Sequence, residues 1–143
     1  MRNITFIVVH CSANSEGSKL RMRDIDRYHR SLGWNGCGYH YVIPTDGTIE
    51  RGREESMAGA HCKGHNSHSI GVCYVGGLAI DGRTPKDTRT EAQKDALRRW
   101  LTAAPICLIT EADFVLSSVD VHHHIIWFLF FAAPETWQET DFR

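Results

Sequence analysis

The sequence has 143 residues, a length typical of one domain with a sizeable hydrophobic core. Its apolar share of 42% and charged share of 23% are those of an ordinary globular protein, which argues against a fibrous or low-complexity chain. The formal net charge is −1 and basic residues do not cluster with aromatic ones, so neither nucleic acid nor an anionic membrane is an expected partner.

The first predicted element is a strand over residues 4–9, where an aliphatic, β-branched run with little alternation indicates burial on both faces. A polar loop over residues 14–19 follows. A helix is predicted over residues 23–32, and Gly33 would end it. The face that this helix would bury consists of Ile25, Tyr28, His29 and Leu32.

A β-hairpin is predicted next, with strands at 39–44 and 48–50 and with Asp46-Gly47 supplying the positive φ angles of the turn. Residues 69–75 form a further apolar strand. Thr90 and Gln93 form a capping box that opens a helix through about Leu101. The buried side of that helix is expected to hold Ala92, Ala96, Leu97 and Trp100.

This alternation of strands and helices predicts an α/β fold, a central mixed β-sheet flanked by α-helices, in a single domain over residues 1–143. Beyond residue 101 the pattern loosens, although residues 115–121 could form a strand. The nine consecutive apolar residues over 125–133 are too few to span a bilayer as a helix, so no membrane insertion is expected. No coiled coil or interface pattern appears, and a monomer is therefore expected.

The cysteines indicate a reducing compartment. There are five of them, an odd number without a CxxC pair, as is typical of reduced thiols in a cytosolic chain. The first residues lack a long apolar segment followed by a small-residue cleavage site, so no secretory signal is expected.

Four segments could carry chemistry, and the nine histidines point to them. His10 ends the first strand, where α/β proteins place their sites, although a lone histidine there is more often structural. Tyr39-His40 begins the hairpin, where a packed strand aromatic is the simpler interpretation. Residues 60–66 form a polar, glycine-containing loop before a strand, and a solvated loop is the alternative. Residues 122–124 are three successive histidines. Because neighbouring residues of a strand point to opposite faces, at most two of them can face one metal.

Taken together, these segments resemble the type 2 N-acetylmuramoyl-L-alanine amidases, above all phage lysozymes with amidase activity; the peptidoglycan recognition proteins share that fold. The resemblance covers residues 4 to about 101 in order and is weak over 102–143. It is carried by Val8-Val9-His10-Cys11-Ser12-Ala13, Gly33-Trp34, Gly38-Tyr39-His40-Tyr41-Val42-Ile43, Asp46-Gly47-Thr48-Ile49-Glu50, Gly52-Arg53, the run from Ala58 to Asn66, Ser69-Ile70-Gly71-Val72-Cys73 and Val75-Gly76-Gly77.

The resemblance implies a peptidoglycan hydrolase that uses zinc (Zn2+) held by two histidines and a cysteine or aspartate. Zinc at such an open site lowers the pKa of bound water and polarises a carbonyl oxygen. The target would be the amide between N-acetylmuramic acid and L-alanine of the stem peptide. His10 matches the first ligand and Tyr39 the catalytic tyrosine, and His61, Asn66 and His40 match the substrate cleft. The protein would be made in the cytoplasm and would reach the cell wall after release.

The C-terminal part departs from this family. His124, or alternatively His122, can stand for the second histidine ligand. The family's Lys-x-Cys-Pro segment has no counterpart, because no lysine follows Lys94 and no cysteine follows Cys107. An active zinc amidase and a peptidoglycan-binding module with an incomplete zinc site are therefore both open. A frameshifted, recombined or mispredicted coding end would produce such a tail.

Overall fold

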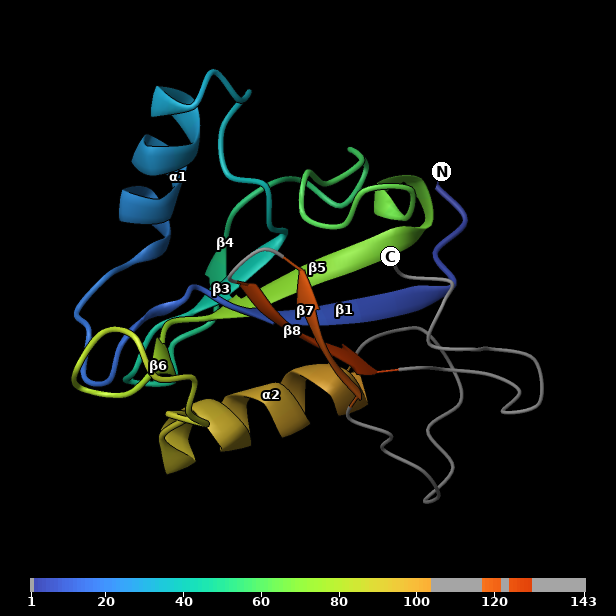
Figure 1. The fold of residues 1–143 in the computed structure, drawn as a ribbon. Helices are drawn as coiled ribbons and strands as arrows, with labels where there is room; N and C mark the ends of the chain where they lie inside the picture. The colour runs from blue at the N-terminus through green and yellow to red at the C-terminus, as the bar shows by residue number, and fades with distance from the viewer. Residues whose placement is uncertain (1, 104–116, 122–123, 130–143) are drawn as a thin grey trace.

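The computed structural model describes residues 2–103, 117–121 and 124–129, and these residues form a sheet with helices packed around it (Figure 1). The strands are β1 (Phe6–Cys11), β2 (Asn14–Ser15), β3 (Tyr41–Ile43), β4 (Glu50–Arg51), β5 (Ser69–Tyr74), β6 (Gly77–Leu78), β7 (Ser117–Val121) and β8 (His124–Leu129). The helices are α1 (Met22–Ser31) and α2 (Glu91–Ala103), with a short 3-10 turn, η1 (Asn66–His68).

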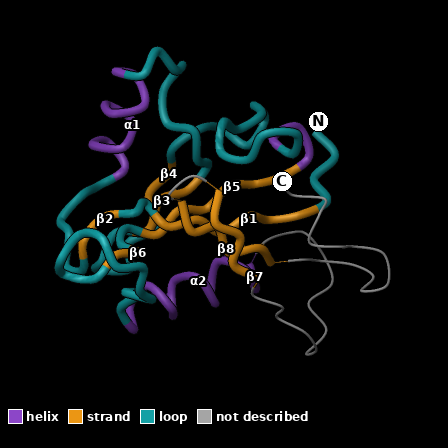
Figure 2. Tube along the Cα trace, viewed as in Figure 1, coloured by secondary structure: helices purple, strands orange, loops and turns teal. Residues whose placement is uncertain are grey.

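The main sheet has six strands in the order β4-β3-β5-β1-β8-β7. Figure 2 shows these strands gathered between α1 and α2. The central pairs β1–β5 and β3–β5 are parallel, whereas β4, β7 and β8 join in antiparallel fashion. β2 and β6 form a separate parallel pair. The prediction of a mixed sheet flanked by helices is therefore confirmed.

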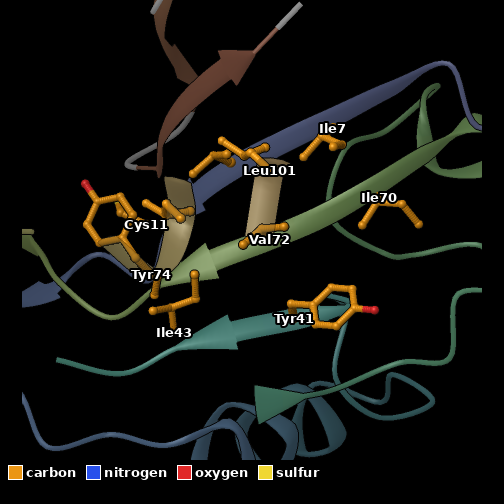
Figure 3. Close-up of a cluster of buried hydrophobic side chains, with 11 residues drawn as sticks. Ile7, Cys11, Tyr41, Ile43, Ile70, Val72, Tyr74 and Leu101 are labelled. Atoms are coloured by element: carbon orange, nitrogen blue, oxygen red, sulfur yellow. The ribbon is translucent and has the colours of Figure 1, made fainter. Parts of the chain in front are cut away.

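One face of the sheet is covered by α2. Strand alternation places Ile7, Val9 and Cys11 of β1 on this face. The cluster, shown in Figure 3, consists of Ile7, Val9, Cys11, Tyr41, Ile43, Ile70, Val72, Tyr74, Ala96, Leu97 and Leu101. Because the odd-numbered residues of β1 are committed to this core, Val8 and His10 belong to the opposite face.

The capping box of α2 is confirmed, since the Thr90 N–H donates to Gln93 Oε1 and the Gln93 N–H to Thr90 Oγ1. The buried side of the helix differs in part from the prediction: Ala96 and Leu97 are buried as expected, but Ala92 is exposed, Trp100 is only partly buried, and Gln93 and Leu101 are buried instead. Gln93 is buried because its amide donates to the carbonyl oxygens of Ile43 (2.9 Å) and Val75 (3.0 Å), at the ends of two neighbouring strands. A polar side chain thus replaces an apolar one in the core because it satisfies two buried acceptors.

The other face holds a smaller cluster beside α1, made of Ile25, Cys37, Val42 and Val75 with Leu20, Met22 and Tyr39 packed against it. α1 ends at Ser31, and Gly33 (φ 85°) follows as expected. Of its predicted buried face, Ile25 and His29 are buried, but Tyr28 and Leu32 are exposed, so the prediction is wrong for those two residues. In the hairpin, only Gly47 takes a positive φ (78°), so the prediction that Asp46 would do so as well is wrong. The Asp46 carboxylate instead accepts the N–H of Thr48, which closes the turn without a left-handed residue there.

Other predictions concern cysteines, membranes and the C-terminal part. Cys11, Cys37, Cys62 and Cys73 are outside any disulfide. In the part of the chain that the structure describes, no helix is long and apolar enough to cross a membrane. The strand expected over 115–121 is present as β7 from residue 117, and residues 115–116 and Cys107 lie outside the described residues.

Candidate functional site

His10 lies near the carboxyl end of β1 on the sheet face that α2 does not cover. Its side chain is only 3% exposed. Nε2 of His10 lies 2.9 Å from Nδ1 of His61, and the two rings meet edge to face with centroids 5.0 Å apart. A hydrogen bond between two imidazoles requires one donor and one acceptor nitrogen, so this contact fixes the orientation of both rings. The sequence placed these residues in different segments, and the fold joins them.

The His61 ring lies between two glycines. A Cβ atom at Gly59 would be 2.3 Å from Cδ2 of His61, and a Cβ atom at Gly71 would be 2.5 Å from the same carbon. Ser69 Oγ is 3.4 Å from Nε2 of the ring. Burial, and then the neighbouring His10, lower the pKa of His61 to about 2, so the ring is neutral at physiological pH. The two glycines thus provide the space in which a neutral His61 contacts His10.

Asn66 orders the loop that carries His61. Its Oδ1 accepts the backbone N–H groups of His61 (2.9 Å) and Cys62 (3.0 Å). Arg2, which the sequence did not single out, ties this loop to the preceding one. Its guanidinium donates to the carbonyl oxygens of Asn66 (2.9 Å) and Glu55 (2.7 Å). Arg2 carried no recognisable signal, because its partners are backbone atoms far along the chain.

Tyr39 packs against the same pair of histidines. Its ring centroid is 5.2 Å from that of His10 and 6.4 Å from that of His61. Burial raises the pKa of Tyr39 well above its ordinary value, and the neighbouring Cys73 thiol adds to the shift. The phenol therefore stays protonated at physiological pH and can donate a hydrogen bond. His10, Tyr39 and His61 form one group, which we call the His10 cluster.

A row of rings continues from the His10 cluster toward α1. The ring of His29 lies 5.6 Å from that of Tyr39, and Trp34 stacks on His29 at 4.5 Å. The Gly38 N–H donates to Nδ1 of His29 (3.0 Å), which fixes the ring. Neither His29 nor Trp34 was predicted as a site residue. The glycine at position 38, shortly after Trp34 and directly before Tyr39, was a usable signal, because glycine commonly marks the close approach of another group.

His40 is 1% exposed and both of its ring nitrogens face backbone groups. The Gly71 N–H donates to Nδ1 (3.0 Å), so the ring proton is on Nε2, which donates to the carbonyl oxygen of Met57 (3.0 Å). The Arg2 guanidinium nitrogen 3.0 Å from Nε2 is also a donor, so that contact is not a hydrogen bond. These contacts join β5 to the loop before His61; the role of His40 in substrate binding stays a prediction.

A polar cavity of about 270 Å³ adjoins His40. Its lining consists of His40, Tyr41, Arg51, Arg53, Glu54, Glu55 and Ser56. Such a wall of charged groups suits a polar ligand better than a lipid chain.

Two of the three predicted metal ligands, His10 and His124, belong to the neighbouring strands β1 and β8. His124 begins β8, and the β1–β8 register pairs His10 with Ile126, two residues further along. His122 lies outside the described residues. Among the side chains that the structure describes, no three of His, Cys, Asp or Glu come together as a metal-binding group. Of the predicted zinc ligands, His10 is the one whose side chain the structure describes, and its role as a ligand stays a prediction.

Comparisons with known proteins show the family to which the chain belongs. An endolysin of Klebsiella phage KP32 is 45% identical over 95 residues, which cover 66% of this chain and 62% of the endolysin. This chain thus spans less than two thirds of that relative's length. The solved N-acetylmuramoyl-L-alanine amidase LysC from Clostridium intestinale is 32% identical, with a TM-score of 0.58 over 71% of this chain and 64% of LysC.

A second solved relative is a peptidoglycan recognition protein, LE, in complex with tracheal cytotoxin, a monomeric diaminopimelic acid-type peptidoglycan. It is 27% identical, with a TM-score of 0.59 over 71% of this chain and 60% of its own. The family pattern described as N-acetylmuramoyl-L-alanine amidase matches residues 1–125, most of the sequence. The chain therefore belongs to the N-acetylmuramoyl-L-alanine amidase family.

Proposed function

We propose that this chain hydrolyses the amide between the lactyl group of N-acetylmuramic acid and the L-alanine of the stem peptide in peptidoglycan. The observation that carries the proposal is the His10 cluster, in which a strand-end histidine is hydrogen-bonded to His61 at 2.9 Å and the tilted ring of Tyr39 packs beside it. Family membership supports it, as does the similarity to a phage endolysin and to a recognition protein that binds a peptidoglycan fragment.

His10 would be one ligand of a zinc ion. A histidine that binds a metal usually uses its other ring nitrogen in a hydrogen bond, and the contact with His61 would supply one. His124 would be the second ligand, because it begins β8, the strand that pairs with β1. His122 is the alternative. When bound, zinc would supply an activated water and polarise the scissile carbonyl.

The protein's own residues would orient the reacting groups. The protonated Tyr39 hydroxyl would donate a hydrogen bond to the oxygen on which negative charge develops. His61 would hold the His10 ring in place, and Asn66 would hold the loop that carries His61. His61, Asn66 and His40 would thereby shape the cleft in which the substrate lies.

A peptidoglycan-binding module with an incomplete zinc site is the second candidate. It is favoured by the sequence after α2, in which no lysine follows Lys94 and no cysteine follows Cys107. A family member that retains the cleft and lacks a metal ligand would bind the wall without cutting it. In both cases we propose a monomer that is made in the cytoplasm and meets peptidoglycan after release. We propose neither a nucleic-acid partner nor insertion into a membrane.

Isolated cell walls separate the two candidates. Purified chain is incubated with walls, zinc per chain is measured by elemental analysis, and new L-alanine N-termini are counted by end-group labelling. One zinc per chain and steady release of L-alanine termini support the amidase. Co-sedimentation with walls and no new termini supports the binding module. His10→Ala should abolish both zinc binding and release, and release that survives this change would refute the assigned site.

A further inference from the structure

The pair Asn35-Gly36 lies in the loop between α1 and β3. The sequence has four asparagines, and Asn35 is the one that a glycine follows. An asparagine in this position can lose its side-chain nitrogen, because the absence of a Cβ on the next residue leaves the backbone nitrogen open to the asparagine Cγ. Asn35 is exposed, and its side chain makes no hydrogen bond to the part of the chain that the structure describes. The side chain is therefore free to turn toward the Gly36 nitrogen.

Two other pairs place an acidic residue before a glycine, and there the glycine nitrogen is occupied. In Asp46-Gly47 the glycine N–H donates to the carbonyl oxygen of Pro44 (2.9 Å), and in Asp81-Gly82 to that of Ala79 (2.9 Å). The Gly36 N–H, by contrast, has no acceptor among the described residues. Removing the proton from a nitrogen that donates a hydrogen bond also breaks that bond, and Gly36 does not have this cost.

The peptide bond between Asn35 and Gly36 is also activated. Nη2 of Arg53 donates to the Asn35 carbonyl oxygen at 3.3 Å. When the Gly36 nitrogen loses its proton, the negative charge is shared with this oxygen, and the neighbouring guanidinium stabilises it. Arg53 makes its other hydrogen bonds to the carbonyl oxygens of Cys37 and Ala58, which carry no formal charge. Its positive charge thus remains available to the anion.

We infer that Asn35 is a site of deamidation, with the Gly36 nitrogen as the nucleophile. This nitrogen bonds to Cγ of Asn35, the Cγ–Nδ2 bond breaks, and Nδ2 leaves as ammonia with the proton that the nucleophile gave up. The product is a cyclic succinimide. Water then opens the ring. Attack at Cγ leaves aspartate, and attack at the backbone carbonyl carbon leaves isoaspartate, whose main chain is longer by one methylene.

The longer main chain of isoaspartate would disturb the hydrogen bonds that follow it. Gly36 is buried, and a Cβ atom there would lie only 3.0 Å from Asp26 Oδ1, so little extra volume fits. The next two N–H groups are fixed: that of Cys37 donates to Asp26 Oδ1 (2.8 Å) and that of Gly38 to Nδ1 of His29 (3.0 Å). Amide hydrogen exchange at these two positions should therefore become faster as isoaspartate accumulates.

Ageing of the whole purified chain at mildly alkaline pH tests this inference. Ammonia is assayed, isoaspartate is measured by enzymatic methylation of its carboxylate, and peptide mass spectrometry locates it. We expect isoaspartate and aspartate at position 35, together with an equal amount of ammonia. Asn35→Gln keeps an amide but would have to close a larger ring, so this product should be lost. Asn66, whose Oδ1 accepts two N–H groups, is the control within the same chain and should stay unchanged.

Two outcomes would overturn the inference. One is an Asn35 that stays intact in the folded chain while the urea-unfolded chain deamidates there, because the fold would then protect the residue. The other is conversion of Asn66 at the same rate as Asn35, because the structure would then not select the site. Neither readout depends on hydrolysis of peptidoglycan.

Discussion

Replacing Gly71 with alanine should push the His61 ring away from His10. The new Cβ would lie 2.5 Å from Cδ2 and 2.6 Å from Cγ of His61, closer than atoms in proteins approach. Gly71 is in the middle of β5 and does not have a positive φ, so the backbone itself accepts alanine. Overlap of this kind costs about 1–3 kcal/mol. Alanine also restricts the unfolded chain more than glycine does, which adds roughly 0.4–1 kcal/mol to the free energy of unfolding.

The expected net loss is therefore about 1–2 kcal/mol in the free energy of unfolding, or a fall in Tm of roughly 3–8 °C for a chain of this size. Urea unfolding followed by circular dichroism measures it. The same substitution is made in a His61→Ala background, where the space above Gly71 is open and alanine should be neutral or stabilising. Equal losses in both backgrounds would refute the reasoning, because the cost would then not come from His61.

Three further predictions concern the supports of the site. Gln93→Leu leaves the carbonyl oxygens of Ile43 and Val75 without their donor and should cost about 2–4 kcal/mol in urea unfolding, whereas Lys94→Ala, at a surface ion pair, should change little. Asn66→Ala should speed hydrogen exchange at the His61 and Cys62 amides, and Asn66→Asp, which keeps the acceptor, should not; equal exchange in the two variants would contradict the role of Asn66. The Thr84 hydroxyl, then two backbone N–H groups, lower the pKa of Asp81 to about 2. The stability that this provides should be present above about pH 4 and lost as the pH falls toward 2. Asp81→Asn should lose less stability in that window, and parallel urea midpoints for the two proteins would show the assignment to be wrong.

The elements of the fold were accessible from the sequence because their signals are local. The aliphatic run at residues 4–9 predicts a buried strand, and β1 occupies Phe6–Cys11. Thr90 and Gln93 predict a helix start by side-chain chemistry alone, and both hydrogen bonds are present. The same reasoning misplaced Ala92, because a helix face calculated from apolar residues cannot anticipate a glutamine that satisfies two buried carbonyl oxygens.

The arrangement within the site was less accessible because its contacts join distant residues. His10 and His61 were each singled out, but their hydrogen bond spans 51 positions, and nothing in either segment specifies the other. Gly71 could have been suspected, since a glycine inside a strand often marks the close approach of a side chain, whereas Gly59 lies in a loop. The side chain that approaches both glycines is that of His61, which comes from a loop and not from a neighbouring strand, so no local pattern specifies it.

The most direct test of the central claim compares the release of L-alanine N-termini from purified walls by the wild-type chain, Tyr39→Phe and Tyr28→Phe. Tyr39→Phe removes a phenolic hydroxyl from the His10 cluster, and Tyr28→Phe removes one from the exposed surface of α1. The account predicts release by the wild type and Tyr28→Phe, and a loss of about a hundredfold or more in Tyr39→Phe. Undiminished release by Tyr39→Phe, or no release by the wild-type chain, would contradict it.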